Sequence, residues 1–208
     1  DAHHFTLLAG HEGVANYSEA LSADSDGLSD DRLTNLQNGQ KDTYSMSESM
    51  SQSRFLSYFG RFEYSILDKY YFDASVRNDA CSRFGVDNRN ATFWAVGGMW
   101  KIKAEDFMFG ASAVNDLNLK VSYGTQGNSS IGDYQHLALI GASTDYAQSN
   151  SLVVGQPSNP NLTWENQALL TVGLNGRLFD RLDVNVEFYQ RTTSSMLMDV
   201  PYSYTTGF

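Results

Sequence analysis

The feature of this chain that most constrains its fold is the alternation of apolar and polar residues over long runs. Within residues 53–66, one set of alternate positions holds Leu56, Tyr58, Gly60, Phe62, Tyr64 and Ile66, and the set between them is mainly polar. Because successive side chains of a β-strand point to opposite faces, this pattern predicts a strand with one apolar and one polar face. The alternation restarts at Tyr70 after Leu67-Asp68-Lys69, which predicts an antiparallel hairpin with a tight turn.

The same alternation recurs along the whole chain and predicts an all-β protein, an antiparallel meander of about seven strands. The expected strands are residues 4–18, 53–66, 70–77, 93–102, 117–123, 164–177 and 182–191. Several of them exceed the roughly 5–6 residues of an ordinary globular strand. A strand that crosses a membrane needs about 9–11 residues, so the lengths favour a transmembrane barrel.

The connections between these strands are expected to alternate in length. Short connections are predicted at 67–69 and 178–181, and a medium one at 103–115, with a helical turn over Ala104-Glu105-Asp106-Phe107. Long connections are predicted at about 20–46, 79–91 and 125–161, and after Arg191. Short turns on one rim and long loops on the other are typical of outer-membrane barrels.

A soluble β-sandwich, acting as a carbohydrate-binding module, is the alternative that gives the same alternation. The two folds differ in what covers the apolar face of the strands. In a barrel that face meets lipid, and in a sandwich it packs against a second sheet. The residues that discriminate are Leu56, Tyr58, Phe62, Tyr70, Phe72 and Val76.

Composition excludes several classes of function. No run of about 18 apolar residues is present, so no transmembrane helix is predicted. The formal net charge of -10 argues against a nucleic-acid partner, because few cations are available to neutralise phosphates. The single cysteine, Cys81, cannot form an internal disulfide. No signal peptide is recognisable at Asp1, and we expect the chain to have been cut from a longer one.

Several motifs in order along residues 65–208 resemble the SusC/RagA family of TonB-linked (TonB-dependent) outer-membrane transporters. The first is the segment from Ser75 to Gly85, followed by Asn88-Arg89 and a strand that ends at Trp100-Lys101-Ile102. The later matches are Glu105-Asp106-Phe107, Asn115 to Lys120, Ser122 to Asn128, Ile131-Gly132-Asp133-Tyr134, Asn159 to Glu165, and Asp199-Val200-Pro201.

The resemblance implies a fragment of a nutrient importer in the cell outer membrane, of the Bacteroidetes-type glycan utilisation class. Members of the family take up oligosaccharides or peptides through a large barrel of about 22 strands that is closed by a plug. The implied partners are a SusD-like surface lipoprotein, outer-membrane lipid, and TonB through an N-terminal region that is missing here. Residues 1–208 would form a partial barrel of about seven strands, with the plug domain and the remaining strands absent. Alone, such a piece has two open edges, and we expect it to oligomerise or aggregate.

The sequence carries no recognisable catalytic constellation and no cofactor motif, so we predict that the chain is not an enzyme. Glu63 and Asp73 are expected to face each other across a hairpin, as paired carboxylates do in glycosidases. Arg61 and Arg77 are expected on the same face as salt-bridge partners, which favours a lumen-lining role for these carboxylates.

Aromatic residues in or beside the long loops are the candidate ligand-binding residues, because sugar rings stack on aromatic faces. They are Tyr134, Tyr146, Trp164, Tyr202 and Tyr204. The other interpretation is that these rings anchor the barrel rim at the membrane interface.

No metal site is predicted, although one acidic loop is a weak calcium candidate. It contains Asp24, Asp26 and Asp30, but Gly27 comes too early and the late glutamate of an EF-hand loop is missing. The other interpretation of this loop is a solvated turn.

Overall fold

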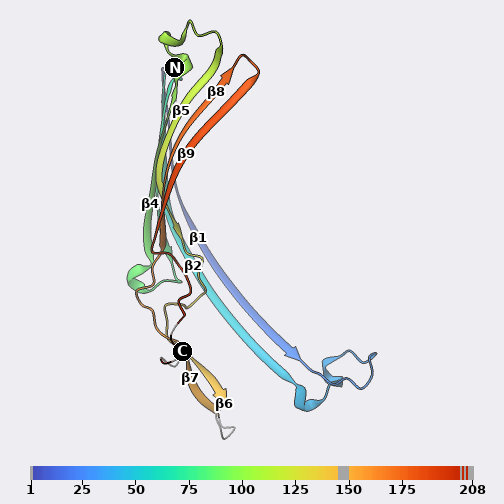
Figure 1. The fold of residues 1–208 in the computed structure, drawn as a ribbon. Coiled ribbons are helices and arrows are strands. Elements are labelled where there is room, and N and C mark those ends of the chain that lie inside the picture. Colours follow the sequence, from blue (N-terminus) through green and yellow to red (C-terminus); the bar gives the residue numbers. More distant parts are fainter. Residues whose placement is uncertain (1, 145–149, 202, 204, 206–208) are drawn as a thin grey trace.

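The computed structural model describes residues 2–144, 150–201, 203 and 205. These residues form one seven-stranded antiparallel sheet in the order β1-β2-β3-β4-β5-β8-β9, together with a separate hairpin of β6 and β7. The strands are β1 (His3–Asp24), β2 (Ser45–Ile66), β3 (Tyr70–Cys81), β4 (Asn90–Lys101), β5 (Val114–Asn128), β6 (Leu139–Thr144), β7 (Asn150–Gln156), β8 (Glu165–Leu178) and β9 (Leu182–Ser194). The predicted seven-stranded meander is therefore confirmed, and the sheet curls along its length (Figure 1).

The helical content of the described residues consists of short 3-10 turns in the connections. They are η1 (Leu36–Asn38), η2 (Lys41–Thr43), η3 (Val86–Asn88), η4 (Ile102–Ala104) and η5 (Asp106–Met108). The helical turn predicted over residues 104–107 is present as η4 and η5, with Glu105 in extended conformation between them.

The register places the predicted apolar side chains on one face of the sheet. Phe62 pairs with Ala74, and Phe72 pairs with Gly98, so apolar positions of neighbouring strands lie side by side. The six discriminating residues Leu56, Tyr58, Phe62, Tyr70, Phe72 and Val76 are each 37–57% exposed. Among the described residues no second sheet covers this face, so the β-sandwich alternative is wrong for this chain.

Two strands are much longer than the sequence predicts. β1 and β2 each have 22 residues, whereas the other strands of the main sheet have 12 to 15. Their outer parts, residues 15–24 and 45–54, pair only with each other and form a two-stranded extension, called here the ribbon. Figure 1 shows the ribbon bending away from the rest of the sheet. The loop predicted at 20–46 is thus shorter, because Asp24 still pairs with Ser45.

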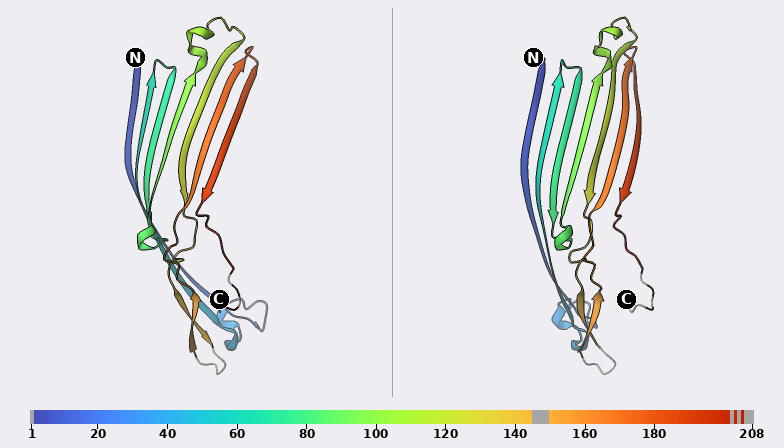
Figure 2. Two further views of the ribbon diagram at one scale, coloured as in Figure 1. Left: turned by 60° about the vertical axis from the view of Figure 1, so that its left-hand side comes forward. Right: turned by 90° about the vertical axis from the view of Figure 1, so that its left-hand side faces the viewer.

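The connections gather at two opposite ends of the sheet. Residues 67–69, 102–113 and 179–181 connect neighbouring strands at one end, called here the turn end. Residues 25–44, 82–89, 129–144 and 150–164 lie at the other, called here the loop end. Figure 2 shows the seven strands running side by side between the two ends. The connections at 67–69 and 179–181 are short and those at 25–44 and after Asn128 are long, as predicted, but the alternation is only partial, because the β3–β4 connection (residues 82–89) is shorter than the β4–β5 connection (residues 102–113).

The hairpin of β6 and β7 lies inside the connection between β5 and β8, where the sequence predicts only a loop. Its strands do not alternate, because Leu139 is followed by Ile140 and Val153 by Val154. The hairpin is not part of the main sheet and projects from the loop end (Figure 1). Among the described residues, β1 and β9 are the two edges of the main sheet.

Candidate functional site

The face of the sheet opposite the apolar one carries a network of charged side chains. The Arg77 guanidinium bridges Glu12 on β1 at 2.8 Å and Asp79 on its own strand at 2.7 Å. It also lies over the ring of Phe59, 5.5 Å from the ring centroid. Each of these pairs joins groups that remain partly solvated, so the network supplies a hydrated, charged surface more than it supplies stability.

The carboxylates of Glu63 and Asp73 do lie opposite each other, because the two residues pair in register. Glu63 is bound by Arg61 at 2.6 Å, as predicted. Arg77, the other expected partner, instead pairs with Glu12 and Asp79. This part of the charged face is therefore a set of ion pairs along and across strands, which fits a lining surface.

Glycines on neighbouring strands make room for large rings on the sheet. A β-carbon at Gly10 would lie 2.6 Å from Cζ of Phe59, and one at Gly127 would collide with the ring of Phe93. An aromatic ring that covers a glycine shields exposed backbone and fixes the pairing of the two strands.

The compact part of the chain is an aromatic core at the loop end. The buried apolar residues of the described chain are Cys81, Phe84, Phe93 and Trp164. The Trp164 ring lies 5.0 Å from Phe84 and 5.7 Å from Phe93, the second contact being edge-on. Its indole N–H donates to the carbonyl of Arg89 at 3.0 Å. The core thus joins the β3–β4 loop to the start of β8.

Polar contacts fix the same loops to one another. Arg83 forms an ion pair with Asp133 at 2.8 Å, and His136 Nδ1 lies 2.9 Å from the Arg83 carbonyl oxygen. The Asn88 amide donates to the carbonyl of Pro160 at 3.1 Å. A β-carbon at Gly85 would come within 2.7 Å of that same carbonyl oxygen, so the close approach requires glycine. The β3–β4 loop and the β5–β8 connection are therefore packed against each other as one unit.

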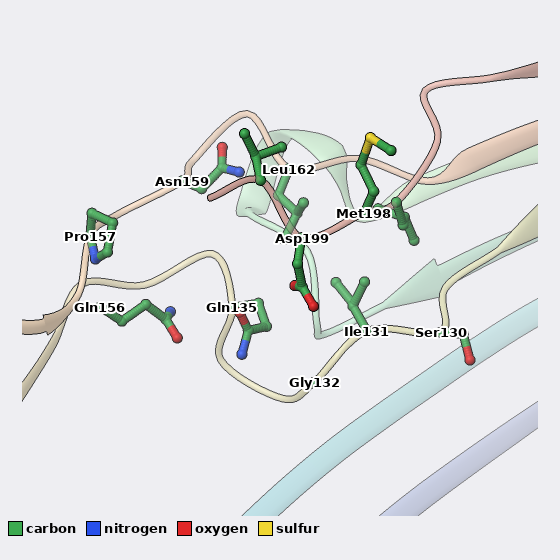
Figure 3. A pocket seen from close by; sticks show the side chains of 12 residues that line it. Ser130, Ile131, Gly132, Gln135, Gln156, Pro157, Asn159, Leu162, Met198 and Asp199 are labelled. Carbon is green, nitrogen blue, oxygen red and sulfur yellow. The ribbon is translucent and has the colours of Figure 1, made fainter. Parts of the chain in front are cut away.

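A pocket of about 570 Å³ lies beside this unit, between the β5–β8 connection and the segment that follows β9 (Figure 3). Its walls include the apolar Ile131, Leu162 and Met198, and its polar side chains include Gln135 and Asp199. Asp199 points its carboxylate into the space between Ile131 and Gln135 (Figure 3). The volume is within the usual range of small-molecule sites, roughly 300–1,000 Å³.

The structure gives two of the predicted ligand-binding aromatics a packing role. Trp164 is 7% exposed and both of its neighbours in the core are aromatic, so stacking a sugar on it would require displacing Phe84 or Phe93. The Tyr134 hydroxyl accepts a hydrogen bond from the backbone N–H of Gln52 at 2.9 Å, which ties the β5–β8 connection to the ribbon. Three further candidates lie outside the described residues: Tyr146, Tyr202 and Tyr204.

The acidic loop does not gather its carboxylates into a cation site. In residues 2–144, 150–201, 203 and 205, no three His, Cys, Asp or Glu side chains lie close enough to hold a metal ion. Asp30 is bound by the Arg32 guanidinium at 2.6 Å, and this contact lowers the Asp30 pKa to about 2. Asp24 accepts a hydrogen bond from Ser22, and the backbone N–H of Asp26 donates to Thr43.

Sequence reasoning missed the residues that join the loops, although their motifs were visible. Arg83, Phe84 and Gly85 belong to one quoted motif, Asp133 to a second, and Pro160 to a third. The structure brings these three motifs into contact. Their shared function as an assembly could not be read from one sequence, because 50 residues or more separate the partners.

Within the part of the chain that the structure describes, no helix is long and apolar enough to cross a lipid bilayer.

Comparison with known proteins gives consistent matches. A family model described as TonB dependent receptor-like, beta-barrel, matches residues 3–208. TonB-dependent receptor P26 of Formosa agariphila is 31% identical over 212 residues, covering 99% of this chain and 21% of the relative. TonB-dependent receptor SusC of Bacteroides thetaiotaomicron is 34% identical over 166 residues, covering 76% of this chain and 17% of the relative.

The solved structures agree with the sequence matches. The structure of the RagAB peptide transporter superposes with a TM-score of 0.92 at 40% identity, covering all of this chain and 23% of that one. A RagAB peptide importer in an open-open state gives a TM-score of 0.85 at 40% identity, covering 99% of this chain and 23% of that one. The chain spans about a fifth of the length of the curated relatives it matches.

Proposed function

This chain belongs to the TonB-dependent receptor-like β-barrel family, and on that premise we propose that its main sheet is a wall segment of an outer-membrane nutrient importer. The rest of a barrel of about 22 strands and its plug would come from the remainder of the protein. The role is transport of a substrate past the wall, without a catalytic step. The observation that carries the proposal is a single sheet with one apolar face exposed and one charged face.

The apolar face supports a lipid environment by its height as well as by its chemistry. On β2 the apolar positions run from Leu56 to Ile66, which is about 33 Å along an extended strand. With a strand tilt of about 40°, this corresponds to a band roughly 25 Å tall, the height typical of outer-membrane barrels. Aromatic side chains lie toward both ends of the band: Trp94 with Tyr123 near the loop end, and Tyr70 with Trp100 near the turn end.

The charged face would line the lumen. Its ion pairs, such as Arg77 with Glu12, lie on the side of the sheet where a barrel encloses water or a plug. The turn end would then face the periplasm, where the plug is coupled to TonB, and the loop end would face the outside.

The loop end and the ribbon are the surfaces on which we place a SusD-like lipoprotein and the substrate. On one face of the ribbon Leu21, Met46 and Met50 are 65–80% exposed, and exposed methionine is common at protein interfaces. The pocket beside Asp199 lies at the same end and could hold part of an oligosaccharide or a peptide. The relative named a RagAB peptide transporter makes a peptide one of the two substrate classes to test first.

The test exploits two adjacent residues that point to opposite faces of β5. Val121 lies on the apolar face and is 43% exposed, and Ser122 lies on the charged face opposite Gly97 and Thr171. In the full-length protein, Val121→Lys is expected to cost about 2–4 kcal/mol of stability in the bilayer and to reduce the amount assembled in the outer membrane. Ser122→Lys is expected to assemble normally.

Assembly is measured as the heat-modifiable folded fraction in isolated outer membranes, and uptake as growth on candidate glycans or peptides. Equal assembly of the two lysine variants would contradict the assignment of the faces. Normal assembly of Ser122→Lys with altered uptake would support the charged face as the lumen wall.

A further inference from the structure

We propose that the connections at the turn end form a lipid-contacting rim that sets how deeply the barrel wall sits in one leaflet. The proposal rests on the proposed function, because it requires the apolar face to lie in a bilayer. All three connections display large apolar side chains that are more than half exposed. These are Leu67 (56%), Phe107 (69%), Phe109 (94%) and Phe179 (65%), called here the turn rim.

Two of the connections are copies of one turn. Their sequences are Ile66-Leu67-Asp68-Lys69 and Leu178-Phe179-Asp180-Arg181, each with an apolar residue, an aspartate and a base at matching positions. Each is closed by a backbone hydrogen bond, from the fourth N–H to the first carbonyl, at 3.0 Å and 3.1 Å respectively. Both central residues have positive φ in each turn, which is the pattern of a type I′ turn.

Leucine and phenylalanine are poor choices for that backbone conformation. Leu67 and Phe179 have φ of 54°, in the left-handed region where a β-carbon clashes with the following carbonyl. Type I′ turns therefore favour Asn, Asp or Gly at this position. The strain occurs twice at the same position of the same turn, so something other than turn geometry accounts for the apolar side chain.

The backbone around each apolar residue is held in the same way and does not depend on the side chain. The N–H of Leu67 donates to the carbonyl of Ala2 at 2.8 Å, and the N–H of Phe179 donates to the carbonyl of Ala113 at 2.9 Å. An asparagine at either position would keep this hydrogen bond and fit the φ angle better. More than half of each apolar side chain is exposed, 56% of Leu67 and 65% of Phe179.

The third connection joins the rim to the apolar face. The Lys103 ammonium donates to the carbonyls of Met108 and Ala111, at 3.1 Å and 2.8 Å, and so fixes the turn that presents Phe107. The Phe107 ring meets the Trp100 ring edge-on at a centroid distance of 6.4 Å. Trp100 lies on the apolar face, paired with Leu119. The exposed surface is thus continuous with the face that we place in lipid.

This continuity identifies the partner as the lipid interface. Arg181 closes the second turn, and a long basic side chain places its stem on apolar surface while its charge reaches headgroups or water. At the first turn, the Lys69 ammonium is instead neutralised by Glu105 at 3.4 Å.

The proposal is tested by measuring the depth of nitroxide labels on the full-length protein in vesicles of phosphatidylcholine and phosphatidylglycerol. Labels are attached through Asp68→Cys and Asp180→Cys at the two turns. Val121→Cys is the reference for lipid, and Asp31→Cys in the β1–β2 loop is the reference for water. The wild-type protein treated with the label sets the background from Cys81, which is 1% exposed.

The measured quantity is the ratio of a label's collision rate with oxygen to its collision rate with a water-soluble nickel chelate. The expected result is a ratio several-fold higher for the labels at 68 and 180 than for the label at 31. If the labels at 68 and 180 give the same ratio as the label at 31, while the label at 121 gives the ratio of a site in lipid, the turn rim is refuted and the proposed function stands. If the label at 121 also reports water, the proposed function fails and the rim fails with it.

A second arm separates lipid contact from a structural role. Leu67→Asn with Phe179→Asn suits the positive φ angles, so a purely structural role predicts no loss of depth. The proposal predicts that this pair shifts the label at 68 toward the value for water. The control pair Leu33→Asn with Leu36→Asn, at the loop end where these side chains are 46% and 52% exposed, is expected to leave that label unchanged. An unchanged label in both pairs would contradict the proposal.

Discussion

Replacing Trp164 by phenylalanine should loosen the loop end without unfolding the barrel wall. The substitution removes the indole N–H that donates to the Arg89 carbonyl. That carbonyl keeps a second donor, the backbone N–H of Cys81 at 3.0 Å, so no buried acceptor is left unpaired. The loss is therefore the net value of one hydrogen bond, about 1 kcal/mol, and not the larger cost of an unsatisfied group.

The smaller ring adds a second loss. Trp164 is buried against Phe84 and Phe93, and a phenylalanine fills only part of that space. We estimate about 1 kcal/mol for the lost aromatic contacts, which gives a total of about 2 kcal/mol. Complete truncation in Trp164→Ala should cost about 3–5 kcal/mol.

Hydrogen exchange of the full-length protein measures this effect where it occurs. About 2 kcal/mol corresponds to a roughly 30-fold larger population of the locally open state. Backbone amides of residues 82–89 and 159–164 should therefore exchange about 30-fold faster in Trp164→Phe, and those in the middle of β3 and β4 should not change. Trp94→Phe is the matched control, because Trp94 is 44% exposed on the apolar face. Unchanged exchange at 82–89, or equal acceleration in the control, would refute the role of Trp164 in the core.

Two further predictions concern ionic contacts. The first is a double-mutant cycle with Arg83→Ala and Asp133→Ala, measured by hydrogen exchange of the amides of residues 129–137. It should give a coupling free energy of about 1 kcal/mol, since the two side chains are only 26% and 17% exposed. Additive effects of the two substitutions would show that the ion pair does not stabilise these loops. The pKa of Glu105 is lowered below its ordinary 4.5, first by the hydrogen bond from the Tyr70 hydroxyl and then by that from the Trp100 indole. The ionised Glu105 carboxylate therefore stabilises the folded protein above pH 4.5, and this stabilisation is lost as the pH falls through the lower pKa that Glu105 has in the folded protein. Melting temperatures of Glu105→Gln should lack this acid-dependent fall, and an acid profile equal to that of the wild type would show that Glu105 does not contribute.

The sheet was largely predictable because the alternation in its strands is strong. Leu56 to Ile66 alternate with polar residues, and that pattern located residues 53–66 of β2, their two faces and the turn that follows them. The ribbon was not predicted, since serines at 45, 47, 49 and 51 alternate with a mixture of Met46, Glu48 and Met50 that gives no apolar stripe. The β6–β7 hairpin was missed because adjacent apolar residues such as Val153 and Val154 break the two-residue period.

The loop end was less predictable, because its contacts join distant segments. Trp164 was interpreted as a platform for sugar stacking, a natural interpretation of an aromatic residue beside a long loop. Its actual partners, Phe84 and Phe93, come from more than 70 residues earlier, and a single sequence gives no pairing between them. The ion pair of Arg83 with Asp133 was hidden for the same reason. Residue type identified these side chains as noteworthy, but only the fold shows that they bind one another.

The unbroken pairing of β1 with β2 has a mechanical consequence. The two strands stay in one register from His3 opposite Ile66 to Asp24 opposite Ser45, over about 70 Å of extended chain. No bulge interrupts that ladder to absorb displacement, and its inner half is tied to β3, which pairs with β2 from Phe55 to Ile66 and whose Arg77 meets Glu12. A partner that pushes on the tip of the ribbon would therefore also displace the inner halves of β1 and β2, which belong to the main sheet.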